Sequence, residues 1–114
     1  VAIATTQGAR ASQGAVLMRR GDLHRRMGND RAAQDDFEAA AALLVEGSAQ
    51  RAQVEQYLGS LAKARGDLDA ALGHYQRSRE GFEHATGGPT VYSWTSALGV
   101  VDIETLSGRA ASVE

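Results

Sequence analysis

The stretch GDLDAALGHYQRS, residues 66–78, repeats the pattern of GNDRAAQDDFEAA, residues 28–40, which begins 38 residues earlier. Each stretch opens with a glycine and continues through an alanine pair to an aromatic residue. The match extends upstream, so Gly21, Leu23, Gly28, Ala32, Ala33 and Phe37 correspond to Gly59, Leu61, Gly66, Ala70, Ala71 and Tyr75. A period of roughly 20–50 residues is typical of proteins that stack similar units, and such proteins usually present binding surfaces.

Glycine-containing breaks divide the chain into segments of helical length. A glycine just past a helix end readily adopts the left-handed conformation that closes the helix. The breaks predict five helices and the start of a sixth, and they fall at Gly28, 46–48, Gly66, 85–89 and Gly108. Residues with side-chain oxygens suited to N-cap positions follow these breaks: Asp30, Ser48, Asp67 and Thr90.

The apolar residues recur at helical spacing in each segment, and no run alternates strictly for more than a few residues. The segment TVYSWT, residues 90–95, is rich in residues that favour strands. Its apolar residues nevertheless step by three and four positions, through Val91, Trp94, Leu98 and Val101. We therefore expect an all-α chain with antiparallel neighbouring helices. We expect Trp94 to face the core and Tyr92 to lie off this stripe, where it could contact a partner.

The repeated residues resemble tetratricopeptide repeats. That pattern pairs a glycine in helix A, a glycine at the A–B turn, an alanine in helix B and an aromatic residue four positions later. Gly21, Gly28, Ala33 and Phe37 match it in one copy, and Gly59, Gly66, Ala71 and Tyr75 match it in the other. A third unit begins with Leu98-Gly99, which resemble Leu58-Gly59. The family's usual repeat is about 34 residues, so the longer period is more similar to kinesin light chains or to helical sensor arrays of bacterial transcriptional regulators.

The resemblance covers roughly residues 12–108 and implies one domain over residues 1–114. It implies a right-handed stack of antiparallel helical hairpins, an α-solenoid with repeats at about 8–46, 48–86 and 89–114, the last one incomplete. Small residues at Gly21, Gly59, Ala33 and Ala71 would let helices approach closely. Phe37 and Tyr75 would then fill the gap to the next hairpin, because a single hairpin cannot bury its apolar face alone.

In tetratricopeptide arrays the A helices line a concave groove, and the resemblance assigns binding candidates to that face. They are Met18, Asp22, Arg25, Arg26, Gln53, Gln56, Ser60, Lys63, Ser93 and Ser96. The face is polar and lacks the lysine–asparagine arrangement with which some members clamp a terminal carboxylate. We expect a scaffold module that binds a protein or peptide there. The alternatives are a regulatory sensor for a small ligand or signalling peptide, and a structural module that self-associates through its incomplete C-terminal repeat.

Composition narrows the function further. The formal net charge is −2, and no basic run is interleaved with aromatic residues, so direct binding of nucleic acid is not expected. The chain has no cysteine and no run of 18 apolar residues, and we expect a cytoplasmic protein with no membrane association. His24, His74 and His84 lack the spacing of metal ligands, which predicts no metal and no cofactor. Asp35-Asp36 is interpreted as a solvated face and Asp67 with Asp69 as a cap, so no enzyme is expected.

Overall fold

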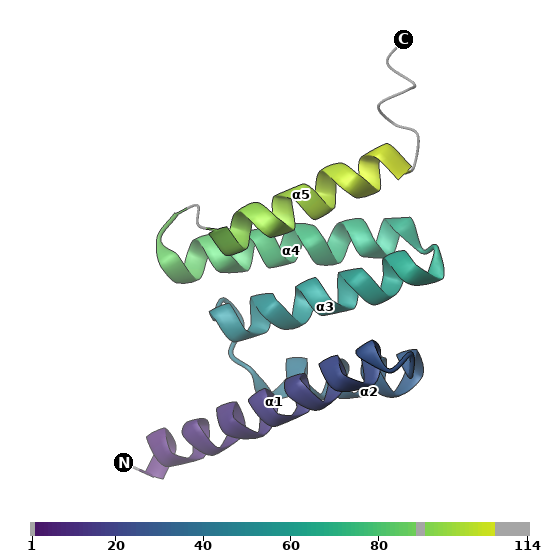
Figure 1. Ribbon diagram of the computed structural model, residues 1–114. Coiled ribbons are helices and arrows are strands. Elements are labelled where there is room, and N and C mark those ends of the chain that lie inside the picture. Colours follow the sequence, from purple (N-terminus) through teal and green to yellow (C-terminus); the bar gives the residue numbers. More distant parts are fainter. Residues whose placement is uncertain (1, 89–90, 107–114) are drawn as a thin grey trace.

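The computed structural model describes residues 2–88 and 91–106, and within these ranges the chain is all-α (Figure 1). Its helices are α1 (Ala2–Arg26), α2 (Asp30–Leu43), α3 (Ala49–Arg65), α4 (Leu68–Thr86) and α5 (Val91–Leu106). Each helix packs against the next one along the chain. In Figure 1, α3, α4 and α5 follow one another upward from the α1–α2 pair. The strand-favouring residues after position 90 belong to α5 and are helical.

The predicted breaks are confirmed at four places, where Gly28, Gly47, Gly66 and Gly87 have φ values of 82°, 85°, 82° and 81°. At the start of α3 the hydroxyl of Ser48 accepts from the backbone N–H of Arg51, and at the start of α4 Asp67 accepts from Ala70. The predicted cap at Asp30 is wrong. Asp30 is the first residue of α2, and Asn29 holds the cap position without a side-chain hydrogen bond. Thr90 and Gly108 lie outside the described residues.

The two copies of the repeat make the same contact within their hairpins. A Cβ added at Gly21 on α1 would lie 2.7 Å from Phe37 Cε1 on α2. A Cβ added at Gly59 on α3 would lie 3.2 Å from Tyr75 Cδ1 on α4. Each glycine therefore admits an aromatic ring from the following helix. Ala33 and Ala71 are fully buried, which confirms the prediction that both are buried between helices.

Two apolar clusters connect the hairpins. In the first, Ala33, Phe37, Ala40 and Leu44 of α2 pack with Val54, Leu58 and Leu61 of α3. The ring of Phe37 also stacks on Tyr57 of α3, with centroids 5.0 Å apart. In the second, Ala62 of α3 joins Ala71 and Tyr75 of α4 and Val100 and Ile103 of α5. Phe37 and Tyr75 are both buried and both reach the next helical unit, as predicted.

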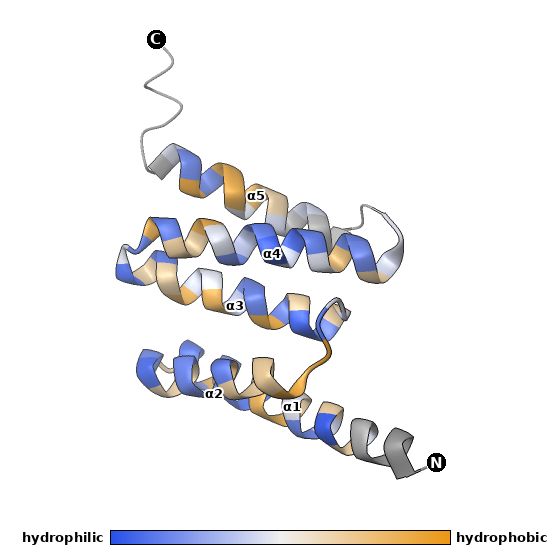
Figure 2. Cartoon of the chain, turned by 180° about the vertical axis from the view of Figure 1, so that it is seen from behind, coloured by the Kyte–Doolittle hydropathy of each residue, from blue (hydrophilic) through white to orange (hydrophobic). Residues whose placement is uncertain are grey.

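The last helix turns a different face inward from the one expected. Trp94 is 67% exposed, although it was predicted to be in the core. Leu98 is 55% exposed, whereas Leu58, its predicted counterpart, is 5% exposed. The physical reason is that α5 has apolar residues on both faces, with Val100 and Ile103 on one and Leu98 and Val101 on the other, so spacing does not select one. Figure 2 shows the orange, apolar segments along this helix. Gly99 decides the docking, because its missing side chain admits the Tyr75 ring of α4.

Candidate functional site

The predicted A-helix face joins α1 to α3 through an aromatic contact. The guanidinium of Arg25 lies 5.4 Å from the centroid of the Tyr57 ring, a cation–π arrangement. Arg25 also donates to the carboxylate of Asp22 at 2.7 Å, and Arg26 contacts the other oxygen of that carboxylate at 3.0 Å. The structure thus brings these three predicted residues together, with the Asp22 carboxylate between Arg25 and Arg26. Arg25 is engaged within the chain and is not a free positive charge.

The α3 part of this face is held by polar contacts. Gln53 donates to the side chain of Gln56 at 3.5 Å, and the hydroxyl of Ser60 donates to the Gln56 backbone carbonyl at 3.2 Å. Lys63 forms an ion pair with Asp102 of α5. Because the Lys63 ammonium donates a hydrogen bond to the Asp102 carboxylate, the pKa of Lys63 is raised above its ordinary value.

A hollow of about 320 Å³ opens on this face beside α4, lined by Ser60, Lys63, Ala64 and Tyr75. The hydroxyl oxygens of Ser60 and Tyr75 lie 3.1 Å apart and share a hydrogen bond. Each hydroxyl retains further capacity to accept, and the exposed Lys63 side chain adds a cation at the rim. The hollow therefore offers hydrogen-bonding groups and charge to a polar ligand.

Three further candidates have different surroundings. Met18 is half-buried and packs against the first apolar cluster. Ser96 is fully buried, so its prediction as a groove residue is wrong. Its hydroxyl lies 2.8 Å from that of Ser78, and this pair satisfies two polar groups between α4 and α5. The side chain of Ser93 lies outside the described part of the structure.

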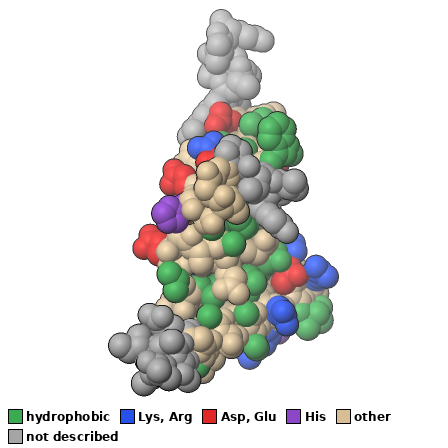
Figure 3. All heavy atoms as spheres, turned by 90° about the vertical axis from the view of Figure 1, so that its left-hand side faces the viewer, with side chains coloured by type: hydrophobic (Ala, Val, Ile, Leu, Met, Phe, Trp, Pro, Cys, Tyr) green, Lys and Arg blue, Asp and Glu red, His purple; other side chains and the backbone are tan. Residues whose placement is uncertain are grey.

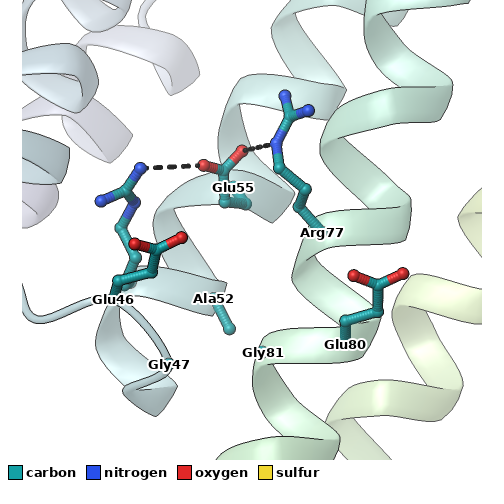
Figure 4. Close-up of a pocket in the computed structure, with 8 residues that line it drawn as sticks. Glu46, Gly47, Ala52, Glu55, Arg77, Glu80 and Gly81 are labelled. Carbon is teal, nitrogen blue, oxygen red and sulfur yellow. Dashed lines mark hydrogen bonds and ion pairs between the residues drawn. The ribbon is translucent and has the colours of Figure 1, made fainter.

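Sequence reasoning missed a charged cluster around Glu55, between α3 and α4. Figure 4 shows Arg77 beside the Glu55 carboxylate, which it reaches at 3.4 Å. Arg51 reaches the other oxygen of this carboxylate, also at 3.4 Å. His74 Nδ1 lies 2.7 Å from the same oxygen as Arg77. A hollow of about 220 Å³ adjoins this cluster, lined by Glu46, Gly47, Arg51, Ala52, Glu55, Arg77, Glu80 and Gly81.

The neighbours of Glu55 determine its charge state. Burial of its side chain favours the neutral acid, but the hydrogen bond from His74 and the nearby positive charges outweigh that effect. The pKa of Glu55 therefore lies below its ordinary value, and the carboxylate remains ionised. With its oxygens already occupied by Arg51, His74 and Arg77, Glu55 holds α3 against α4.

A similar ion pair holds α1 against α2. Asp36 is buried and accepts from Arg20 Nε at 2.8 Å and from a second Arg20 nitrogen at 2.7 Å. The interpretation of Asp36 as part of a solvated face is therefore wrong. The hydrogen bonds from Arg20 lower the pKa of Asp36 below its ordinary value. His24 Nε2 lies 3.8 Å from this carboxylate, which gives His24 a structural position inside the hairpin.

One sequence signal marks both charged pairs. Asp36 and His74 stand 38 residues apart, and each directly precedes the aromatic residue of its repeat. A polar residue at that repeated position, beside a buried ring, indicates a buried partner on the neighbouring helix. Glu55 gives no such signal, because the corresponding position 38 residues earlier is the apolar Leu17.

Comparison of the chain with known families, curated proteins and solved structures gives no match. Residues 2–88 and 91–106 contain no cluster of three or more His, Cys, Asp or Glu side chains that could hold a metal ion. Among the same residues, no helix has both the length and the apolar character required to cross a membrane. The A-helix face and its hollow are therefore the candidate functional site.

Proposed function

We propose that the chain is a non-catalytic module that binds a protein or peptide on the face shared by α1 and α3. The hollow formed by Ser60, Lys63, Ala64 and Tyr75 carries the proposal. It lies on the face to which the resemblance to tetratricopeptide repeats assigns recognition, and it combines hydroxyl groups with the ion pair of Lys63 and Asp102. Matched contacts of Gly21 with Phe37 and of Gly59 with Tyr75 support the repeated hairpin packing on which this proposal depends.

The chemistry of the face suits an extended peptide with polar or acidic side chains. The hydroxyls of Ser60 and Tyr75 can accept hydrogen bonds from peptide N–H groups, and the Lys63–Asp102 pair presents both charges at the rim. The Arg25–Tyr57 contact places a flat, partly apolar platform on the neighbouring turns of the same face. Binding of this kind depends on a few anchor residues, with the surrounding polar contacts setting the position of the ligand.

A peptide selection with a matched pair of variants tests the proposal. A displayed library of random 12-residue peptides is selected on the wild-type chain, and the enriched peptides are titrated against Ala64→Arg and Ala39→Arg. Ala64 lines the hollow, whereas Ala39 is exposed on α2. We expect Ala64→Arg to weaken binding at least about tenfold, because the added side chain fills the hollow, and Ala39→Arg to leave binding unchanged.

Two outcomes would contradict the proposal. Equal affinity of the enriched peptides for both variants would exclude the hollow as the site. Loss of binding only in Ala39→Arg would move recognition to the helix-B side of the hairpins. Circular dichroism of both variants provides the folding control, since both substitutions are at exposed helical positions.

A further inference from the structure

The hollow on the A-helix face has two hydroxyl groups whose protons are both used within the chain. Ser60 donates its proton to the backbone carbonyl of Gln56 at 3.2 Å. A hydroxyl has a single proton, so in the 3.1 Å contact between Ser60 and Tyr75 the phenol donates and Ser60 accepts. The hydrogen bonds therefore run in one direction, from Tyr75 to Ser60 and from Ser60 to the Gln56 carbonyl. The two oxygens offer only their lone pairs to a ligand.

The charged groups beside these hydroxyls form a neutral pair. Lys63 lines the hollow, and its ammonium is bonded to the Asp102 carboxylate of α5. This hydrogen bond is the main cause of the raised pKa of Lys63, and the nearby Tyr75 phenol also raises that pKa. The ammonium therefore keeps its charge, and it has N–H groups beyond the one that Asp102 accepts. The rim thus adds N–H donors to the hollow without adding net charge.

A primary amide complements this set of groups. Its nitrogen donates to oxygens such as those of Ser60 and Tyr75, and its carbonyl accepts from an ammonium such as that of Lys63. A carboxylate has no proton to donate, so it would bring its lone pairs against those of the hydroxyls and its charge beside Asp102. An ammonium or guanidinium would bring a positive charge beside Lys63 and could not accept its N–H groups. Polar groups left without partners in this way weaken binding.

The surroundings of the hollow favour a neutral group as well. Ala64 completes the lining with an apolar methyl group, which suits the methylene groups of a side chain. The formal net charge of the chain is −2. Figure 3 shows acidic and basic side chains toward the margins of one side of the stack, around a mainly uncharged centre. Recognition in the hollow therefore depends on the direction of its hydrogen bonds and not on a surface of one charge.

We propose that the hollow binds the side-chain amide of an Asn or Gln residue in the partner peptide and discriminates against Asp and Glu. The amide nitrogen donates to the hydroxyl oxygens of Ser60 and Tyr75, and the amide oxygen accepts from Lys63. This inference rests on the proposed function, because it specifies what the peptide-binding hollow selects. Ser60 determines the selection, since it accepts the Tyr75 proton and leaves the phenol oxygen as an acceptor.

The first test compares peptides of nearly equal shape. Among the peptides enriched on the wild-type chain, those that bind Ala64→Arg more weakly are sequenced, and we expect Asn or Gln at one shared position. A representative peptide is then synthesised with Gln, Glu or Met at that position, and the three are titrated against the wild-type chain. The Glu and Met peptides should each bind at least about tenfold more weakly than the Gln peptide, because neither side chain donates to the hydroxyl oxygens.

The second test changes the direction of the hydrogen bonds in the chain. Ser60→Ala leaves the Tyr75 proton without its acceptor, so the phenol can donate to a ligand oxygen. The preference for the Gln peptide over the Glu peptide should then fall at least about threefold. Asp102→Asn removes a negative charge beside the ligand and should lower the same preference. Ser12→Ala, at an exposed position of α1 outside the hollow, is the matched control and should keep the wild-type preference.

The outcomes separate this inference from the proposed function. Enriched peptides that bind Ala64→Arg as well as the wild type would reject the hollow as the site, and both proposals with it. Peptides that bind Ala64→Arg more weakly, yet share no amide position or bind equally well with Glu, would overturn the amide selection alone. A shared basic or acidic residue would overturn it in favour of a contact with Asp102 or Lys63. An unchanged ratio of Gln to Glu affinities in Ser60→Ala would overturn the selection by hydroxyl direction, since a purely structural role changes both affinities alike. Circular dichroism checks that each variant is folded.

Discussion

Asp36 and His74 occupy the same position in the two hairpins, and each contacts a side chain of the preceding helix, with the carboxylate on opposite sides of the two contacts. Asp36 contacts Arg20 of α1 at 2.7 Å, and His74 contacts Glu55 of α3 at 2.7 Å. Exchanging α2 and α4 would put Asp36 beside Glu55, which is repulsive. The opposite placement of the carboxylate therefore distinguishes two hairpins that share the same glycine–aromatic packing.

The contact between His74 and Glu55 is expected to stabilise the α3–α4 pair. His74→Ala removes the shortest hydrogen bond to the Glu55 carboxylate, which is only 7% exposed, and should cost about 1–3 kcal/mol. Replacing both residues, with Glu55→Leu and His74→Ala, should recover part of this loss because no buried charge is left with fewer partners. Urea denaturation measures both free energies. A double variant as unstable as the sum of the two single variants would contradict the coupling.

Acid should weaken the α1–α2 pair. The pKa of Asp36 is lowered by Arg20, so the unfolded state, with an ordinary Asp pKa of about 3.9, binds more protons in acid. The contribution is fully present above about pH 5 and is lost as pH falls through the lowered pKa of the folded state. We expect Asp36→Asn to have a shallower dependence of the unfolding free energy on pH below about 5. Equal slopes for both proteins would show that Asp36 is not responsible.

The helical glycines should differ in their response to alanine. At Gly99 an added Cβ would lie 2.8 Å from the Tyr75 ring, and Gly99→Ala should cost about 1–3 kcal/mol through overpacking. At Gly73 the nearest atom is the mobile end of Arg77 at 3.5 Å. Gly73→Ala should instead stabilise the chain by about 0.5–1 kcal/mol, because alanine favours helix. Thermal unfolding of the two variants gives the comparison, and equal shifts would argue against the close approach of α5.

The ring of Phe37 should be among the most important for stability. It is fully buried and stacks on Tyr57, so Phe37→Ala should cost about 3–5 kcal/mol through lost burial and the cavity that remains. Trp94→Ala serves as an aromatic control at an exposed site and should change the unfolding free energy of the monomer little. Urea denaturation at a concentration where the chain is monomeric makes the measurement. Similar losses in both variants would contradict the burial of Phe37.

The repeat predicted much of the local structure, since its signals are local. Gly66 ends α3 and Ser48 begins it because turn and cap preferences depend on a few adjacent residues. The buried positions of Ala33 and Ala71 followed from their shared offset. The binding face of α1 and α3 was predicted in the same way, and the structure shows two of its residues, Arg25 and Lys63, engaged with Asp22 and Asp102.

The sequence by itself determined that the chain is helical, where its helices break and which small and aromatic residues meet within a hairpin. Only the tertiary structure decided which side of α5 is buried, because both sides are apolar and the choice depends on how Gly99 meets Tyr75. The tertiary structure likewise decided that Glu55 and Asp36 are buried in ion pairs. Their partners lie on neighbouring helices, at separations where spacing along the chain carries no information about distance in space.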